Sequence, residues 1–282
     1  MDKWNLIIDV ENCINCNMCV LACQDEHVDN DFPNYAAPMP KHGARWIEID
    51  RKERGQAPMI DVAYLPMLCN HCDNAPCIKA AKNGAVTKRD DGIVIIDPIK
   101  SKGQKHLVDS CPYDRIWWNE ELQIPQTWIF DAHLLDEGWE KPRAASVCAT
   151  GSMVAKKVSD EEMAKIVEEE NLEVLQPKKG IKPRVYYKNL YRFNKCFIGG
   201  SVAVRNGDIE DCIRDANVQL IQGSDTISET STDIFGDFKF DKLDENSGKY
   251  RVTISADGYS STSIDVDLKE SITLDDIYLT KI

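Results

Sequence analysis

Four cysteines lie close together near the start of the chain, in the stretch CINCNMCVLAC at residues 13–23, at gaps of two, two and three residues. Three thiols at two-residue gaps share one tight loop, so their sulfurs can converge on one cube of iron and sulfide, while the fourth points away from it. Structural zinc usually takes its ligands as two separated pairs. The spacing therefore favours an iron-sulfur cluster over zinc.

The other cysteines and the overall composition narrow the class of protein. The chain has 282 residues and 11 cysteines, nine of them within the first 148 residues. The N-terminal stretch has no basic segment followed by a long apolar core, so we expect no export signal, a cytoplasmic location and reduced thiols. No apolar run approaches the roughly 20 residues of a membrane helix, so no membrane span is expected. The net charge of -13 argues against nucleic-acid binding, which uses clustered Lys and Arg.

A second set of cysteines stands in CNHCDNAPC, at Cys69, Cys72 and Cys77. A 4Fe-4S cube takes four thiolates, so each upstream triplet needs one more ligand. Two single cysteines qualify, namely Cys111 in CPY and Cys148 in SVCATGS. The cysteine pattern therefore predicts two sites, each completed by a distant fourth thiol.

Several stretches carry a resemblance to a known family: CINCNMC, CNHCDNAPC, RDDGIVIIDP, CPY, HLLD, KPRVYYKNLYRF and FGDFKFD. The first 150 residues resemble the four-cluster ferredoxin-type subunits of molybdopterin oxidoreductases of the DMSO reductase family. In those subunits the first cysteine group pairs with the fourth and the second with the third. The chain as a whole is similar to the small subunits of pyrogallol-phloroglucinol transhydroxylases, chiefly through KPRVYYKNLYRF and the C-terminal segment.

Carried over residue by residue, the family pairing accounts for two 4Fe-4S clusters held by cysteines of this chain, and none of its residues is expected to be catalytic. His71 lies inside the second cysteine set, and we expect its ring to pack over that cluster or to donate a hydrogen bond to a sulfide. Cys196 and Cys212 are expected to be free thiols. The implied ligands are Cys13, Cys16, Cys19 and Cys148 for the first cluster, and Cys69, Cys72, Cys77 and Cys111 for the second.

Two further cysteine groups of the four-cluster family are missing here. The third group would fall on Ser101, Gln104 and Leu107, with Ala81 as the partner position. Thiolates are the ligands that hold such cubes. We therefore expect that cluster to be absent, as the resemblance implies for transhydroxylase small subunits too.

The fourth group, which transhydroxylase small subunits keep, would fall on Ile129, Ala132 and Ala144. None of these side chains binds iron, so Cys23 is left without companions and is expected to be a buried small hydrophobe. An alternative is that Asp131 or His133 joins Cys23 as a ligand. The preferred expectation is two clusters, where the resembled family carries three.

Composition changes along the chain and predicts three parts in an α+β fold. We expect a ferredoxin-like iron-sulfur domain with insertions at 1–158, and a helix with an extended connector at 159–196. From about residue 197, short alternating runs recur at roughly ten-residue spacing with turn residues between them. They predict a seven-stranded antiparallel β sandwich or barrel at 197–282, similar to transthyretin-like and carboxypeptidase-regulatory-like modules.

Short patterns also predict individual elements. The β-rich runs WNLIIDV (4–10), GARWIEIDRKERG (43–55) and GIVIID (92–97) are expected to be strands. Ser159 and Glu162 form a capping box ahead of apolar residues at helical spacing, which predicts a surface helix of about three turns.

The substrate chemistry is expected to take place in a partner subunit, because this chain has neither a Gly-rich phosphate loop nor the spacing of a catalytic triad. The resemblance implies a heterodimer whose large subunit carries molybdenum on two molybdopterin guanine dinucleotides. That enzyme moves a hydroxyl group between polyhydroxybenzenes, with no net electron flow. Such a reaction tolerates the loss of an intermediate cluster.

Two other functions stay open. The chain is alternatively an electron-transfer subunit of another molybdenum oxidoreductase, such as an aromatic hydroxylase or dehydroxylase or a respiratory reductase, which requires a conducting path between clusters. A third possibility is a structural adaptor whose clusters only staple the fold, so that neither changes oxidation state in turnover.

Overall fold

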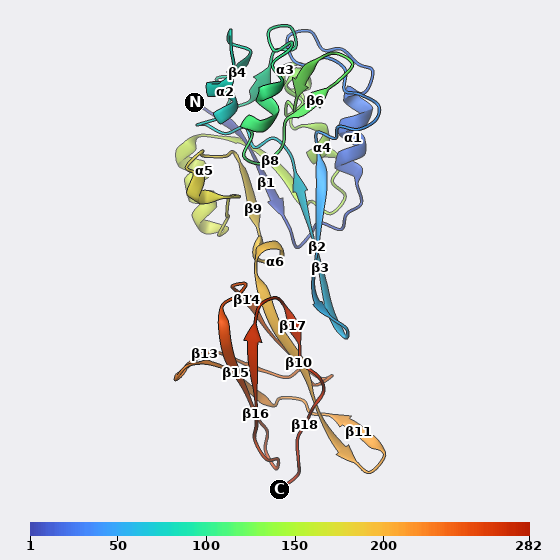
Figure 1. Cartoon of the computed structure of the whole chain (residues 1–282), viewed down its shortest axis with the longest axis vertical. Helices are drawn as coiled ribbons and strands as arrows, with labels where there is room; N and C mark the ends of the chain where they lie inside the picture. Colours follow the sequence, from blue (N-terminus) through green and yellow to red (C-terminus); the bar gives the residue numbers. More distant parts are fainter. The chain divides into compact units, whose positions relative to one another are not determined.

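The structure, a computed structural model, describes residues 1–282 and divides into two compact units (Figure 1). The first unit contains residues 1–51 and 64–190, and the second contains residues 52–63 and 191–282. This grouping differs from the three-part division expected from the sequence, because part of the expected connector pairs with the N-terminal strand of the first unit. No helix has the length and apolar character that crossing a membrane requires.

A three-stranded sheet, in the order β8-β1-β9, organises the first unit. The central strand runs antiparallel to β8 and parallel to β9. Its five middle residues are all buried, as in a strand covered on both faces. The strand predicted at residues 4–10 is thereby confirmed. The bounds are β1 (Lys3–Asp9), β8 (Met153–Val158) and β9 (Val185–Lys188).

Helix α5 (Asp160–Glu169) follows β8 directly and confirms the predicted surface helix. The Ser159 hydroxyl accepts a 3.2 Å hydrogen bond from the backbone N–H of Glu162, which satisfies a donor that the first helical turn leaves free. Met163 is buried against Ile7 of β1. The helix therefore packs its apolar stripe on the sheet.

The rest of the first unit consists of short elements joined by the loops that carry the cysteines. Two small hairpins pair β4 with β5 and β6 with β7, and the strand predicted at residues 92–97 is confirmed as β5. The bounds are α1 (Met18–His27), α2 (Pro76–Ala80), β4 (Val86–Lys88), β5 (Val94–Ile96), η1 (Lys105–Ser110), β6 (Trp117–Asn119), β7 (Ile124–Gln126), α3 (Ala132–Asp136), α4 (Arg143–Ser146) and η2 (Pro177–Lys179).

The second unit is built from two sheets. One has β10 at its centre, flanked by β11 and β14, with the short strands β17 and β18 pairing with β10 in parallel. The other has the order β13-β12-β15-β16 and is antiparallel throughout. The bounds are β10 (Cys196–Asn206), β11 (Ile209–Cys212), β12 (Asn217–Gln222), β13 (Asp225–Ser231), β14 (Asp237–Leu243), β15 (Gly248–Ser255), β16 (Thr262–Leu268), β17 (Ile272–Thr273) and β18 (Ile277–Tyr278).

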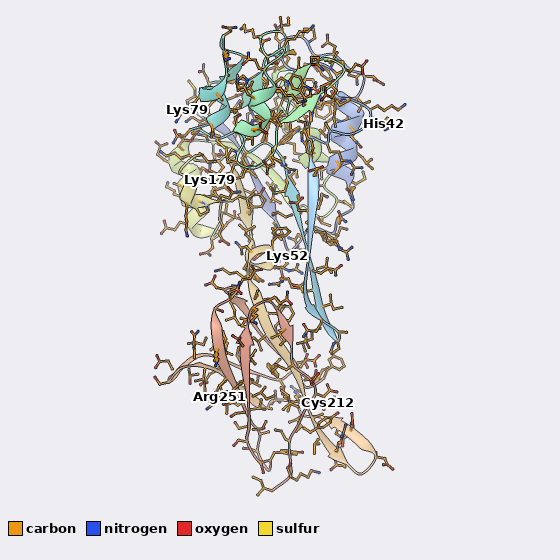
Figure 2. All side chains as sticks on the ribbon, in the orientation of Figure 1. His42, Lys52, Lys79, Lys179, Cys212 and Arg251 are labelled. Carbon is orange, nitrogen blue, oxygen red and sulfur yellow. The ribbon has the colours of Figure 1, made fainter.

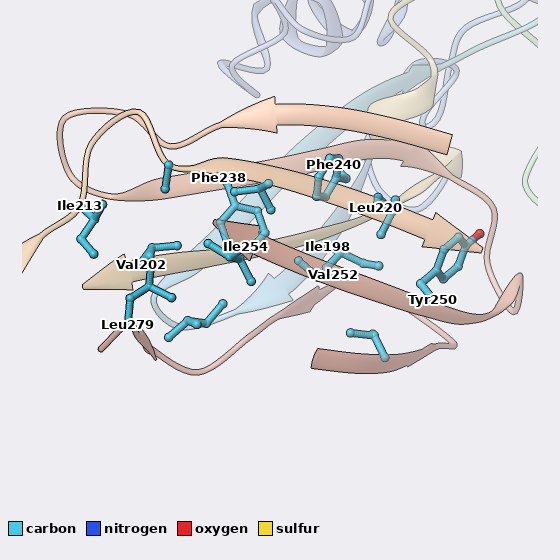
Figure 3. Packing of buried hydrophobic residues seen from close by; sticks show 14 of the residues in the cluster. Ile198, Val202, Ile213, Leu220, Phe238, Phe240, Tyr250, Val252, Ile254 and Leu279 are labelled. Atoms are coloured by element: carbon cyan, nitrogen blue, oxygen red, sulfur yellow. The ribbon is translucent and has the colours of Figure 1, made fainter. Parts of the chain in front are cut away.

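The two sheets share one hydrophobic core (Figure 3). Val202 and Phe238 of the first sheet are buried in the same cluster as Leu220, Val252 and Ile254 of the second. Two sheets that face each other across an apolar layer form a β sandwich. Strands β10 to β16 pair with one another in antiparallel fashion, and the two-residue strands β17 and β18 pair in parallel with β10.

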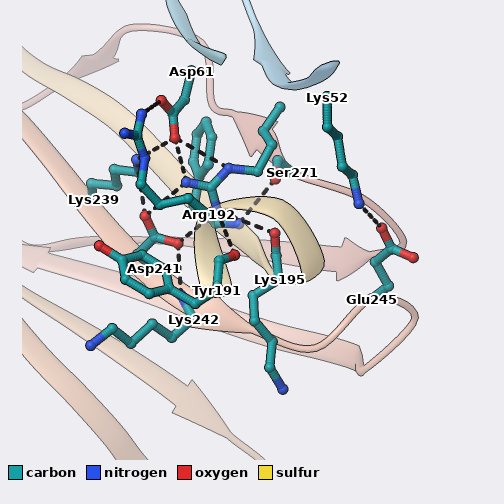
Figure 4. Close-up of polar contacts among 12 residues, drawn as sticks. Lys52, Asp61, Tyr191, Arg192, Lys195, Lys239, Asp241, Lys242, Glu245 and Ser271 are labelled. Carbon is teal, nitrogen blue, oxygen red and sulfur yellow. Dashed lines mark hydrogen bonds and ion pairs between the residues drawn. The ribbon is translucent and has the colours of Figure 1, made fainter. Parts of the chain in front are cut away.

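In the hairpin of β2 (Glu48–Gln56) and β3 (Met59–Met67), β2 covers residues 48–55 of the strand predicted at 43–55, and the predicted residues 43–47 are not in a strand. The tip of this hairpin belongs to the second unit. Arg54 holds the tip there, with a side chain that is 1% exposed. Its Nε and Nη2 donate to Asp61, and its Nη1 donates to Asp241 at 3.0 Å (Figure 4). Nη1 also donates to the carbonyl oxygen of Lys195 at 3.2 Å. One buried guanidinium therefore joins three segments of the second unit.

The backbone at the tip of the β2–β3 hairpin also packs closely against the rest of the second unit. Gly55 has a φ of +78°, and a Cβ there would collide with the ring of Phe197. The Thr273 hydroxyl lies 3.1 Å from the carbonyl oxygens of both Gln56 and Met59 and can donate to either. Glycine is required at residue 55 because both its backbone angle and its surroundings exclude a side chain.

Acid is expected to weaken the second unit through this network. Burial alone would raise the pKa of Asp61, but hydrogen bonds from Arg192 and Arg54 outweigh it, and the folded-state pKa is lowered. The pKa of Asp241 is also lowered, again against the effect of burial. A carboxyl with a lowered folded pKa stabilises the fold above its unfolded pKa of about 3.9, and loses that contribution as pH falls through the folded value.

The measurement is urea unfolding of the protein at pH 6, 4 and 3. All six tryptophans lie in the first unit, so far-UV circular dichroism is compared with tryptophan fluorescence to separate the two units. The replacement of both Asp61 and Asp241 by Asn should flatten the loss below pH 4. An equal acid dependence in this double variant would contradict the assignment.

Candidate metal centres

The first cysteine group is assembled by the pairing of β1 with β8. Asp9 at the end of β1 donates its N–H to the carbonyl oxygen of Ser152 at 2.7 Å, and the Ser152 hydroxyl donates to the Asp9 carbonyl at 2.8 Å. This clamp brings the loop after β1 beside the loop before β8, although more than 130 residues separate them. Cys13 and Cys148 lie on these two loops.

The loop after β1 then turns sharply into α1. Asn15 and Asn17 both have positive φ, at 56° and 59°, a conformation that Asn adopts more readily than most residues. Cys19 lies in the first turn of α1 and is buried, whereas Cys16 is exposed and Cys13 and Cys148 are half-buried. Burial raises the pKa of Cys19 to about 12, and the neighbouring thiols of Cys13, Cys148 and Cys16 contribute to the increase. The structure thus gathers the four predicted ligands of the first cluster.

The second cysteine group surrounds an apolar hollow. All four predicted ligands line it, together with Val94, Ile96 and Tyr113. They lie around this space and do not converge on a point where a single metal ion would bind. The elements that place them are the loop after β3, helix α2 and the loop after η1. The ligands are Cys69, Cys72, Cys77 and Cys111.

Burial in this hollow disfavours negatively charged thiolates, so deprotonated cysteines here need a nearby positive charge. Burial raises the pKa of Cys69 well above its usual value, that of Cys72 to about 12 and that of Cys77 to about 11. The ammonium of Lys88 acts in the opposite direction on Cys72 and Cys77 but does not outweigh burial. Four thiols in an enclosed apolar space fit an iron-sulfur cluster, because iron supplies the positive charge that holds them deprotonated.

His71 lies at the edge of this hollow, with a φ of 44°. Its Nδ1 accepts a hydrogen bond from the N–H of Val94 at 3.0 Å, so the neutral ring carries its proton on Nε2. Burial lowers the pKa of His71 to about 3, which keeps the ring neutral. Nε2 is buried without a hydrogen-bond partner in the protein. The ring packs beside Trp128, at a tilt, and edge-on to Phe130, with ring centroids 5.8 and 5.5 Å away.

Cys23 lies outside both groups, and hydrogen bonds occupy its polar surroundings. The carboxylate of Asp131 interacts with His27 Nε2 at 3.1 Å and accepts from Trp128 Nε1 at 3.2 Å and the backbone N–H of Arg143 at 2.8 Å. Both carboxylate oxygens of Asp131, the first of the two alternative ligands, therefore already interact with other protein groups.

The second alternative ligand, His133, has one of its two ring nitrogens paired, and its Nδ1 is buried without a hydrogen-bond partner. Its Nε2 lies 2.8 Å from Glu26 Oε1, and Glu26 also accepts from Arg143. The positions that correspond to the missing fourth group are packed in the interior. They are Ile129, Ala132 and Ala144, all 2% exposed or less.

The positions of the missing third group are also filled. Leu107 is fully buried in a small apolar cluster with Val86 and Val94. The Gln104 side chain accepts from the N–H of Lys82 at 2.9 Å and donates to the carbonyl of Lys100 at 2.8 Å. Packing and hydrogen bonds therefore take the place of that cluster.

The two remaining cysteines lie in the second unit. Cys196 begins β10 and is buried, whereas Cys212 ends β11 and is exposed (Figure 2). Neither forms a disulfide, and both are free thiols. They take no part in either candidate centre.

Sequence reasoning missed the charged residues that hold the second cysteine loop. Lys88, Asp73 and Arg184 form an ion-paired group beside Cys72. No motif marks them, since Lys88 reads as an ordinary strand residue. Only their convergence in space indicates a role.

Comparison with known proteins agrees with this geometry. Residues 60–158 match the family described as 4Fe-4S dicluster domain, and residues 198–280 match the carboxypeptidase regulatory-like domain. The chain is 47% identical over 269 residues to the pyrogallol hydroxytransferase small subunit of Pelobacter acidigallici, across 94% of this chain and 95% of that protein. The chain belongs to this small-subunit family. The resemblance expected from the sequence and the α+β fold class are both confirmed.

More distant relatives share the iron-sulfur part. A tetrathionate reductase subunit of Salmonella typhimurium is 30% identical across 67% of this chain and 73% of that protein. The arsenate respiratory reductase iron-sulfur subunit of a Shewanella strain is 31% identical across 50% of this chain and 55% of that protein. The pyrogallol hydroxytransferase small-subunit family thus lies among iron-sulfur subunits of larger enzyme complexes.

Proposed function

We propose that this chain is the iron-sulfur subunit of a heterodimeric molybdopterin enzyme that transfers hydroxyl groups between polyhydroxylated aromatics. The observation that carries the proposal is the pair of four-cysteine groups in a chain 47% identical, over nearly its full length, to a pyrogallol hydroxytransferase small subunit. The active site would lie in the large partner subunit, and molybdenum on two molybdopterin guanine dinucleotides would supply the oxygen-transfer chemistry there. No residue of this chain would be catalytic.

This chain's own residues would hold two 4Fe-4S clusters. Cys13, Cys16, Cys19 and Cys148 would surround the first, and Cys69, Cys72, Cys77 and Cys111 would surround the second. Both groups draw their fourth thiol from a distant loop, so each cluster would also cross-link the fold. The net charge of -13 supports a complex that binds no nucleic acid, and reduced thiols suit a cytoplasmic location.

A third cluster around Cys23 is not supported by the surroundings of that residue. The two alternative ligands near it already hold protein partners, as the hydrogen bonds of Asp131 and His133 indicate. A chain with two clusters and no intermediate one suits hydroxyl transfer without net current. The clusters would then set or store the oxidation state of the molybdenum.

A second candidate is an electron-transfer subunit of a molybdenum reductase. It is favoured by the similarity to subunits of tetrathionate reductase and arsenate respiratory reductase. Electron tunnelling falls steeply with distance, so this function needs clusters that form a continuous path and an outlet to a donor or acceptor. A third cluster in this chain would therefore favour it.

The deciding experiment is the content of iron and acid-labile sulfide in the anaerobically purified complex, with EPR of the reduced protein. After subtraction of the large subunit's share, we expect about eight irons for this chain, at four per 4Fe-4S cluster. About twelve irons would contradict the two-cluster proposal and bring the electron-transfer function forward. A content near zero would contradict both.

A further inference from the structure

Lys88 stands at the end of β4 with its ammonium turned onto the loop of the second cysteine group. Its Nζ donates to the carbonyl oxygens of His71 at 2.8 Å and Cys72 at 3.1 Å. The third carbonyl partner is Gly92 at 3.0 Å, in the turn that joins β4 to β5. The Asp73 carboxylate, 3.0 Å from Nζ, is a fourth acceptor, so four oxygens share the three N–H donors of the ammonium. Lys88 thereby ties the ligand loop to the adjacent hairpin.

Asp73 and Arg184 complete this arrangement. Asp73 lies 3.0 Å from Lys88 Nζ and accepts two further hydrogen bonds, both 2.8 Å, from Nε and Nη2 of Arg184. Arg184 also pairs with Asp160, which in turn pairs with Lys3. The connected group therefore contains three cations and two carboxylates. Its excess charge is positive, and the Lys88 end of it contacts the cysteine loop.

The Lys88 side chain is 20% exposed, so water screens its charge only in part. Because Lys88 Nζ donates to the carbonyl oxygens of His71 and Cys72, its positive charge lies beside the sulfurs of the ligand loop, where it favours the more negative state of a cluster. Reduction of a cluster adds one negative charge to the atoms that these sulfurs hold. Net charge and hydrogen bonding around a cluster are among the main protein contributions to its reduction potential.

We propose that Lys88 is a positioning residue of the second iron-sulfur centre, which fixes its ligand loop and raises the reduction potential of its cluster. The inference rests on the proposed function, since it requires a cluster at this site. The first centre is an internal reference, because its cysteines lie on other loops and have no contact with Lys88. Asp73 should act in the opposite direction, because it brings negative charge to the same place.

The test compares Lys88→Met, Lys88→Arg and Asp73→Asn in the full complex by anaerobic redox titration with EPR detection. At a fixed potential, Lys88→Met should lower the ratio of reduced to oxidised second cluster about tenfold, which is 59 mV for one electron. Asp73→Asn should raise that ratio, and Lys88→Arg should keep it near the wild-type value. The first cluster should titrate unchanged in all three variants.

The outcomes separate the inference from the proposed function. An unchanged second-cluster potential in Lys88→Met, with all iron retained, would overturn the inference and leave a purely structural lysine. If Lys88→Met loses the second cluster, Asp73→Asn decides, because it keeps the ammonium and removes a neighbouring negative charge. A lowered or unchanged potential there overturns the inference. A wild-type complex without a second cluster would instead refute the proposed function.

Discussion

Replacing Cys72 with alanine in the full complex is expected to remove about four of the irons bound by this chain, one 4Fe-4S cluster. Cys72 is buried and lines the hollow of the second group with three other thiols. Without it, a cube would be held by three thiolates in place of four. Because metal binding is coupled to folding, the loops of Cys69 to Cys77 and Cys111 should also lose their cross-link, with a lower thermal midpoint.

Cys23→Ala is the matched control for this experiment. Cys23 is 2% exposed and Cys72 is 8% exposed, so both substitutions remove a buried sulfur. Only Cys72 belongs to a group of four. We expect Cys23→Ala to keep the full iron content and the wild-type EPR spectrum. A loss of about four irons in Cys23→Ala would show that a cluster exists where the structure places a hydrogen-bonded network instead.

Replacing Arg54 with methionine is expected to destabilise the second unit by about 3 kcal/mol, the lower end of the range for breaking a buried ion pair. The guanidinium is 1% exposed and is the shared partner of Asp61 and Asp241. Its loss would leave two largely buried carboxylates, at 17% and 22% exposure, with one strong partner fewer each. The lower value applies because Arg192 still pairs with Asp61 and Lys239 with Asp241.

The measurement is urea unfolding followed by far-UV circular dichroism, with tryptophan fluorescence as the report of the first unit. Arg251→Met is the matched control, because Arg251 pairs with Asp265 on the open surface of β15 and β16 (Figure 2). That variant should leave the unfolding midpoint unchanged. Adding Asp61→Asn and Asp241→Asn to Arg54→Met should restore part of the lost stability, since neutral amides remove the uncompensated charge. Equal effects of Arg54→Met and Arg251→Met would contradict the role of the network.

Cys72→Ala and Arg54→Met test different properties of the protein, namely cofactor binding and the stability of the second unit. Loss of Cys72 tests whether the thiol groups hold the cofactor on which the proposed function depends. Loss of Arg54 tests how a hairpin tip distant in the sequence becomes part of the β sandwich. Iron content should respond to the first variant and not to the second.

Local patterns predicted a large part of this molecule correctly. The strands at 4–10 and 92–97, most of the strand at 43–55, the capped helix after Ser159 and the C-terminal β domain are all present. These elements depend on the periodicity of apolar residues and on caps, which neighbouring residues determine. Thiol spacing also predicted the two cysteine groups, because it reflects the geometry of a loop that surrounds a cluster. The structure brings the thiols of each group together.

Other features depend on contacts between residues far apart in the chain. The sequence did not show that Arg54 seats a hairpin tip in the second unit, that Asp131 and His133 are already paired, or that Lys88 meets the backbone of the ligand loop. The sequence positions of charged residues do not reveal their partners, since any Lys, Arg, Asp or Glu can also lie on a solvated surface without one. The folded backbone determines which charged groups meet, and burial strengthens the interaction between them. The amino-acid sequence therefore predicted which thiols would hold iron, and the tertiary structure decided the charges around them.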